Sequence, residues 1–179
     1  MKASRRVALA GVFSALCVVL LFIGSVFDVL DLTTAAFAGF VILVALTELG
    51  SGSALAVYAV SSVIAALILP NKGSALFFAV FSGYYPVLKV PLNKIKPKWL
   101  SRLARILVFN AALAASAAAL VYLLQIPLAE YGVRTEKAWY IALFVLAANA
   151  VFIVYDLALE RASVFYVKKI RNHVFGKRR

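Results

Sequence analysis

The sequence is short of the residues that form disulfides, metal sites and acid–base pairs. Its 179 residues include one cysteine and one histidine, and seven acidic residues stand against nineteen basic ones. Cys17 therefore has no partner for an intrachain disulfide, and His173 is too far along the chain to form a His/Cys metal site with it. We expect no metal and no cofactor.

Motifs that carry enzymatic chemistry are also missing. The sequence has no phosphate-binding glycine loop, no HExxH, no GxSxG, and no pair of carboxylates with a histidine nearby. It also lacks the clustered intramembrane acids of ion pumps and the arginine ladder of voltage sensors. The sequence thus predicts that the protein is not an enzyme.

What the sequence does contain is long apolar segments. Apolar residues make up 65 % of the chain and charged residues 15 %, and the mean hydropathy is +0.99. Soluble domains have about 45–50 % apolar and about 25 % charged residues. The composition predicts an all-α integral membrane protein with a single transmembrane domain, residues 1–179. Because the net charge of +12 lies next to the apolar segments, we expect it to face membrane lipid rather than nucleic acid.

Six apolar segments are predicted to be membrane spans. They cover residues 7–27, 33–47, 54–69, 74–88, 103–124 and 138–158. A helix needs about 20 apolar residues to cross a bilayer, so the second to fourth segments must gain length from their polar flanks. The basic, amphipathic tail at 159–179 is predicted either to lie on the membrane surface or to extend the sixth span.

A basic stretch at residues 89–105 sets the predicted orientation. It reads KVPLNKIKPKWLSRLAR and holds six of the nineteen Lys and Arg residues, with Pro86, Pro91 and Pro97 in or beside it. The prolines predict a break between the fourth and fifth spans. Basic residues stay on the cytoplasmic side, and six spans place sixteen Lys and Arg inside and three outside. We therefore predict a compact six-helix bundle in a plasma membrane, most simply a prokaryotic inner membrane, with both termini cytoplasmic.

Polar residues inside the spans indicate contacts between helices. Asn110 and Asn149 reach similar depths in the last two spans, so the simplest interpretation is a hydrogen bond between antiparallel helices. Asp156 and Glu48 lie near the predicted inner surface, where Lys89, Arg102 and Arg105 also lie. We expect ion pairs there rather than a proton or cation relay, because each acid has many bases nearby. Whether Asn110, Asn149 and Asp156 serve structure or function stays open.

The predicted outer ends carry the most suitable residues for a small-molecule site. Such sites are apolar cavities with a few convergent polar groups, and the irregular loop at 125–137 lies at this end to close over one. The candidates for substrate binding are Asp31, Asn71, Tyr131, Trp139 and Tyr140, together with Asn149 inside the sixth span. Trp139 and Tyr140 have the alternative role of aromatic anchors at a membrane boundary.

Small residues recur at helical spacing in the first span, at Ala8, Gly11, Ser14 and Ala15. In lipid, small residues let helices approach closely. The neighbour is either another helix of the same bundle or a partner membrane protein, and the spacing leaves both open.

Over nearly its full length the chain resembles the substrate-binding S components of energy-coupling factor (ECF) vitamin transporters. The resemblance rests on size, on six helices with short loops, on the RRVALAGVFSAL start at 5–16 and on GSGSALAVYAVSSVIAALILPNKGSA at 50–75. It implies that Ala8, Gly11, Ser14 and Ala15 contact a transmembrane coupling subunit. It also implies that a vitamin-like nutrient binds near the outer face and that cytoplasmic ATPases power its release.

A membrane scaffold is the alternative. Rod-shape-determining membrane proteins resemble S components in size and helix number. A scaffold of that type has no small-molecule substrate and uses its helix faces and basic inner surface for partners.

Overall fold

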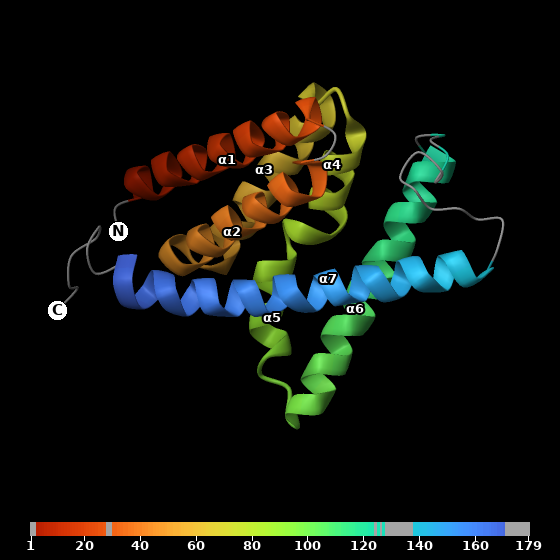
Figure 1. Cartoon of the computed structure of the whole chain (residues 1–179). Coiled ribbons are helices and arrows are strands. Elements are labelled where there is room, and N and C mark those ends of the chain that lie inside the picture. The colour runs from red at the N-terminus through yellow and green to blue at the C-terminus, as the bar shows by residue number, and fades with distance from the viewer. Residues whose placement is uncertain (1–2, 28–29, 124, 126, 128–137, 171–179) are drawn as a thin grey trace. The chain divides into compact units, whose positions relative to one another are not determined.

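The computed structural model describes residues 3–27, 30–123, 125, 127 and 138–170, and its elements are helical (Figure 1). Six helices in this part of the chain are long and apolar enough to cross a membrane: Ala3–Val26, Asp31–Leu49, Ser51–Ile68, Lys72–Leu92, Lys98–Tyr122 and Ala138–Lys169. Each predicted span is matched by one of them. The second to fourth reach 19, 18 and 21 residues by including polar flanks, as expected.

The chain divides into two compact units, which we describe separately. The first consists of residues 1–90 and 157–179, and the second of residues 91–156. Helix α7 (Ala138–Phe165) contributes residues to both. The organisation as a single transmembrane domain stays a prediction.

In the first unit, α2 (Asp31–Leu49) packs against α1 (Ala3–Val26), α3 (Ser51–Ile68) and α4 (Lys72–Phe77). One side of α2 is lined by small and aliphatic residues that recur every three to four positions and have no exposed surface: Ala35, Ala38, Ile42 and Ala45. Their small size lets the neighbouring helices approach, which is how helices pack tightly in lipid.

Two glycines bring backbones into direct contact with side chains in this unit. A Cβ atom at Gly24 would overlap Oγ1 of Thr34, and one at Gly83 would lie 2.5 Å from the ring of Tyr58. Any larger residue at either position would push neighbouring helices apart. Gly24 therefore sets how closely α1 approaches α2.

The connection between α2 and α3 is a single residue. Gly50 has φ 83°, in the left-handed region that favours glycine, and its N–H donates to the carbonyl of Leu46. The connection is therefore shorter than the gap at 48–53 between the second and third predicted spans, because residues 51–53 already belong to α3.

The connection between α3 and α4 caps both helices. Oδ1 of Asn71 accepts a 2.8 Å hydrogen bond from the N–H of Gly73 at the start of α4. Nζ of Lys72 donates to the carbonyls of Ala66 and Leu69 at the end of α3. These caps, rather than the end of the apolar run, decide where the helices stop.

The fourth span is not a uniform α-helix. After α4 comes a π-helical segment, η2 (Phe78–Ser82), and then α5 (Tyr85–Leu92). The hydroxyl of Tyr58 donates a 2.6 Å hydrogen bond to the carbonyl of Ala79 within η2. A π segment changes the backbone hydrogen-bond register, and Tyr58 satisfies one of the carbonyls in this segment.

The connection between the fourth and fifth spans is shorter than predicted. α5 continues through Pro91 to Leu92, and α6 (Lys98–Ala118) begins directly after Pro97, so residues 93–97 form the connection. The break between the spans is confirmed, but residues 89–92 and 98–102, which lie between the two predicted spans, are helical. Pro86 lies in the first turn of α5, where proline is tolerated, and Pro91 lies in its last turn.

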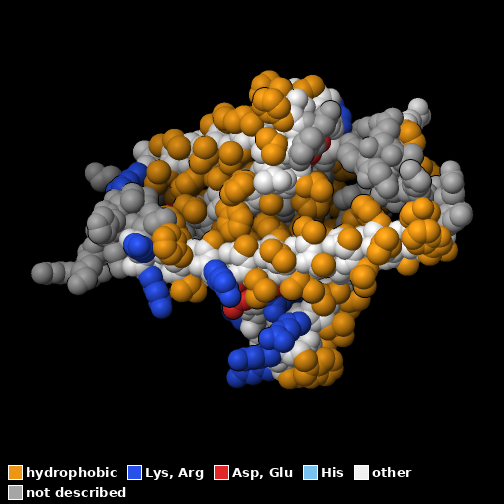
Figure 2. Space-filling view, in the orientation of Figure 1, with side chains coloured by type: hydrophobic (Ala, Val, Ile, Leu, Met, Phe, Trp, Pro, Cys, Tyr) orange, Lys and Arg blue, Asp and Glu red, His pale blue; other side chains and the backbone are white. Residues whose placement is uncertain are grey.

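In the second unit, α6 pairs with the first part of α7. The rings of Phe109 and Phe152 are buried and stacked, with centroids 4.5 Å apart and planes 8° from parallel. The large apolar side chains on the outer sides of the helices, such as Leu107 and Val154, are exposed. α6 continues into the π-helical segment η3 (Ala119–Leu123). Apolar side chains cover much of the visible face of the molecule (Figure 2).

The sixth span is longer than predicted. α7 runs past residue 158 to Phe165 and is followed by the π-helical segment η5 (Tyr166–Ile170). Of the two alternatives for the tail, the described part thus extends the sixth span. Residues 171–179 lie outside the described residues.

Candidate functional site

A buried polar pair lies in the first unit. Nδ2 of Asn71 donates a 2.7 Å hydrogen bond to Oδ2 of Asp31, whose residue is 8 % exposed. Asp31 begins α2 and Asn71 caps α4, so the bond joins the starts of two helices that are distant in sequence. Burial of a carboxylate is costly unless it is hydrogen-bonded. Asn71 provides such a bond.

A third polar residue follows in the same turn of the chain as Asn71. Ser74 has no exposed surface, and its hydroxyl has no hydrogen-bond partner among the described residues. An unsatisfied buried hydroxyl costs about 1–3 kcal/mol. A ligand or a water molecule would complete its hydrogen bonding.

The remaining candidates for substrate binding lie in the second unit. Trp139 and Tyr140 open α7, and their rings stack with centroids 3.7 Å apart. Asn149 lies ten residues further along the helix, about 15 Å away at 1.5 Å per residue. The structure therefore brings Asp31 to Asn71 and Trp139 to Tyr140. Tyr131 lies outside the described residues.

Asn149 is fully engaged with Asn110. Each amide donates to the other, with Nδ2 to Oδ1 distances of 2.9 and 3.1 Å. Each Nδ2 also donates within its own helix, Asn110 to the carbonyl of Ile106 and Asn149 to that of Val145. The predicted bond between antiparallel helices is confirmed. Because both amide groups use both donor hydrogens, a ligand at Asn149 would have to displace one of these bonds.

An ion pair lies one turn from the stacked phenylalanines. Nη1 of Arg105 is 2.6 Å from Oδ2 of Asp156, and their side chains are 11 % and 14 % exposed. The predicted pairing of Asp156 with a base is thereby confirmed. Glu48, the other acid, accepts a 3.4 Å hydrogen bond from the hydroxyl of Tyr166.

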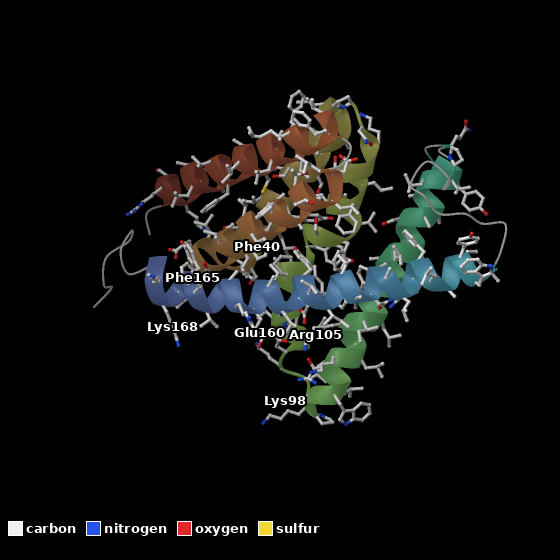
Figure 3. All side chains as sticks on the ribbon, in the orientation of Figure 1. Phe40, Lys98, Arg105, Glu160, Phe165 and Lys168 are labelled. Atoms are coloured by element: carbon white, nitrogen blue, oxygen red, sulfur yellow. The ribbon has the colours of Figure 1, made fainter. Side chains whose placement is uncertain are left out.

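A second and weaker ion pair lies in the first unit. Nζ of Lys89 is 3.9 Å from Oε2 of Glu160, whose side chain is 61 % exposed. Glu160 lies one turn after Asp156 on α7. The two bases at the ends of the 89–105 stretch therefore each have an acidic partner on that helix; Arg105 and Glu160 are labelled in Figure 3.

The small residues of α1 do not all share one environment. Ala8, Gly11 and Ala15 are exposed, and a Cβ at Gly11 would meet no atom within 4 Å. Ser14 is buried, and its carbonyl accepts a 3.4 Å hydrogen bond from Oγ of Ser61 on α3. Three of the four predicted docking residues therefore form an open face, and Ser14 belongs to the packing of the unit.

The role of Arg6 is not among the predictions made from the sequence. Its Nε donates to Oγ of Ser53 at 2.7 Å, and its Nη2 donates to the carbonyl of Leu49 at 3.0 Å. A cation at the last carbonyls of a helix is favourable, so Arg6 caps α2. Arg6 and Leu49 lie at similar distances in sequence from the connection between α1 and α2. In an antiparallel pair of helices this spacing places them side by side, and it could have indicated their contact.

The chain matches no family model, no curated protein and no solved structure. A functional proposal therefore depends on the geometry of its own residues. The first unit offers a buried polar pair at the start of α2 and an arginine cap at its end, about 27 Å apart along the helix. It also offers an open face of small residues on α1.

Proposed function

We propose that the chain is the substrate-binding membrane subunit of an ECF-type transporter. In this proposal it is an integral membrane protein of six helices, with both termini on the cytoplasmic side of a prokaryotic plasma membrane. It captures a small, water-soluble, vitamin-like nutrient from outside and releases it inward with a transmembrane coupling subunit and cytoplasmic ATPases.

The observation that carries the proposal is the separation of two features on the α1–α4 unit. The Asp31–Asn71 pair lies at one end of α2, and the exposed small face of α1 begins next to the other end, where Arg6 caps that helix. With the charge-derived orientation, the polar pair faces outside and the small face lies in the inner half. A carrier that receives its ligand on one side and its partner near the other needs this arrangement.

The polar pair favours a nutrient that carries hydrogen-bond donors. Asp31 presents carboxylate oxygens, which act as acceptors, and the buried Ser74 hydroxyl adds a group that is able to donate or accept. Small-molecule sites use a few convergent polar groups of this kind to orient the ligand.

The exposed face of α1 suits the coupling subunit. Gly11 has open space where a side chain would be, so a partner helix can approach the backbone there as helices do in small-xxx-small contacts. Uptake against a gradient requires an energy source, and the sequence has no phosphate-binding loop of its own. The ATPases in the partner complex supply it.

The test compares two helical glycines, Gly11 on α1 and Gly52 on α3, at each of which an added Cβ would meet no atom within 4 Å. Purification of the full chain from its native membrane should recover the coupling subunit and two ATPases. Gly11→Leu should abolish their recovery, whereas Gly52→Leu should not. Equal recovery from both variants would remove α1 as the docking face.

Ligand capture is tested on the same preparations by mass spectrometry of the extracted small molecules. We expect a bound nutrient in the unmodified chain and in Gly11→Leu, and at least about tenfold less in Asp31→Ala, because a lost charged hydrogen bond costs about 1.5–3 kcal/mol. Absence of any bound small molecule together with absence of ATPases would contradict the proposal.

A membrane scaffold is the second candidate, and one observation favours it. The second unit turns most of α6 and the first part of α7 outward, including large apolar side chains such as Leu107 and Val154. Such surfaces bind either lipid or other membrane helices. A scaffold would recover membrane proteins through the second unit, with no nutrient and no ATPase.

A further inference from the structure

The six bases of the 89–105 stretch fall into two groups. Lys89 and Arg105 are buried and have acidic partners. The four between them, which we call the basic surface, are exposed and have no acidic partner among the described residues: Lys94, Lys96, Lys98 and Arg102. The sequence contains no acid between Glu48 and Glu130 that could neutralise them locally.

Apolar side chains lie directly beside the basic surface. Trp99 is 66 % exposed, and Leu103 and Leu107 follow it at four-residue intervals on the same face of α6, also exposed. Lys98 and Arg102 each precede one of them by one residue and so lie on the adjoining face. Figure 2 shows Lys and Arg side chains gathered next to apolar ones where α6 begins, and in Figure 3 the Lys98 side chain extends away from the helix.

We propose that the basic surface binds the headgroups of anionic phospholipids. The proposal rests on the membrane embedding in the proposed function, but not on its nutrient or its coupling subunit. The phosphate of a headgroup accepts hydrogen bonds from Lys and Arg, and each base near an anionic membrane surface strengthens binding about fivefold. Trp99 then occupies the boundary depth that tryptophan favours, with Leu103 and Leu107 among the acyl chains.

A lipid suits this surface better than the acidic face of a protein. The charged and apolar side chains lie next to each other around the start of α6, so the binding partner must present negative charge and hydrocarbon side by side. A bilayer boundary offers both at every point. A soluble acidic partner would leave Trp99 and Leu103 exposed to water.

The experiment uses Trp99 as the reporter. The chain has two tryptophans, so Trp139→Phe leaves Trp99 as the single source of tryptophan fluorescence. The full-length variant is placed in phosphatidylcholine vesicles that contain a small, equal fraction of brominated phosphatidylglycerol or brominated phosphatidylcholine. We expect brominated phosphatidylglycerol to quench Trp99 at a concentration at least about fivefold lower, and added salt to reduce this preference.

Two sets of substitutions separate the basic surface from net charge. K94Q/K96Q/K98Q/R102Q should remove the preference to within about twofold. A control that removes the same number of exposed bases elsewhere should retain it: R5Q/R161Q/K168Q/K169Q. If the first variant does not fold, K94Q/K96Q changes only the connection at 93–97 and should still lower the preference.

Three results would overturn the proposal. One is equal quenching of Trp99 by both brominated lipids in the parent. Another is an equal loss of preference in the control variant. The third is an acidic protein that binds the parent and not the K94Q/K96Q/K98Q/R102Q variant while the lipid preference is absent, which would assign the surface to that protein. Because nutrient binding is not measured, failure here leaves the transporter proposal to its own test.

Discussion

Gly24 shows how much of the packing depends on one missing side chain. The space where its Cβ would lie is filled by Thr34, whose Oγ1 also donates to the carbonyl of Leu30. The hydroxyl is therefore satisfied by carbonyls at the start of α2 while it touches the backbone of α1. The contact depends on how α1 and α2 are aligned along their lengths. No residue pattern within either helix specifies this alignment.

We predict that Gly24→Ala destabilises the protein. The new methyl group overlaps Thr34, and overpacking of this kind costs about 1–3 kcal/mol. Thermal unfolding in detergent should show a lower midpoint than that of Gly11→Ala, whose methyl group meets nothing within 4 Å. Adding Thr34→Ala should recover part of the loss. Equal midpoints for Gly24→Ala and Gly11→Ala would contradict the close approach of α1 to α2.

The paired amides of Asn110 and Asn149 allow a second prediction. In membranes such bonds contribute about 0.6 kcal/mol on average and up to about 1.7 kcal/mol. Asn110→Ala and Asn149→Ala should each lower the free energy of unfolding, and the double variant should lose less than the sum, because the second change removes a bond already broken.

A double-mutant cycle measured by unfolding in mixed micelles checks this prediction. Ser116→Ala is a suitable control, because its hydroxyl bonds to the carbonyl of Ala112 in its own helix. It should show no coupling to Asn149→Ala. Additive losses for Asn110 and Asn149 would mean that the amides act independently.

At the scale of elements, the pairing of α6 with α7 depends on a few contacts. The amide pair, the stacked Phe109 and Phe152, and the Arg105–Asp156 ion pair follow one another along both helices, with the apolar surfaces on either side left exposed. In the proposed membrane location such polar contacts would be effective, because two apolar helices gain little from each other in lipid.

The two ion pairs on α7 should differ sharply in what they contribute. Asp156→Ala leaves the Arg105 guanidinium, 11 % exposed, without its partner, and a buried unpaired charge costs about 3–5 kcal/mol. Arg105→Met together with Asp156→Leu should recover most of that loss. Glu160→Ala should cost less than about 1 kcal/mol, because its carboxylate is 61 % exposed. Equal losses for Asp156→Ala and Glu160→Ala, measured by unfolding in mixed micelles, would contradict this ranking.

The sequence predicts the number of long helices well and their ends less well. Apolar runs mark each span, because a membrane-length helix needs them, and the depth of Asn110 and Asn149 is enough to pair them. Hydropathy does not predict the capping residues, which set the helix ends. Gly50 lies between α2 and α3 and Asn71 precedes α4, and all three helices extend beyond their apolar runs to reach these caps. The π segment at 78–82 carries no pattern of its own.

The candidate site was only partly predictable for a related reason. Asp31 and Asn71 were recognisable as polar residues at one end of the spans, and they meet in the structure. The cap formed by Arg6 and the burial of Ser14 depend on how α1 is aligned with α2 and α3. That alignment comes from tertiary packing, which a single sequence does not display.

At the scale of the whole molecule, the orientation in the membrane is open to direct measurement. Cys17 is the sole cysteine and is buried, so Cys17→Ala gives a background without thiols. In this background we expect Glu130→Cys to react with an impermeant maleimide in intact cells. Asn93→Cys should react after permeabilisation, because basic connections stay inside. Labelling in the reverse order would overturn the orientation and the outward position of Asp31.

The cap formed by Arg6 has a consequence for biogenesis. Its two acceptors lie 43 and 47 residues later in the chain. When α1 leaves the ribosome both acceptors are still inside the exit tunnel, so the guanidinium must remain hydrated or in contact with phosphate until α2 and the start of α3 have followed. Arg6 can therefore form these hydrogen bonds only once α1 and α2 are both in place. In a nascent chain arrested before Ser53, the N-terminal end of α1 should lack the bond from Arg6 to Ser53.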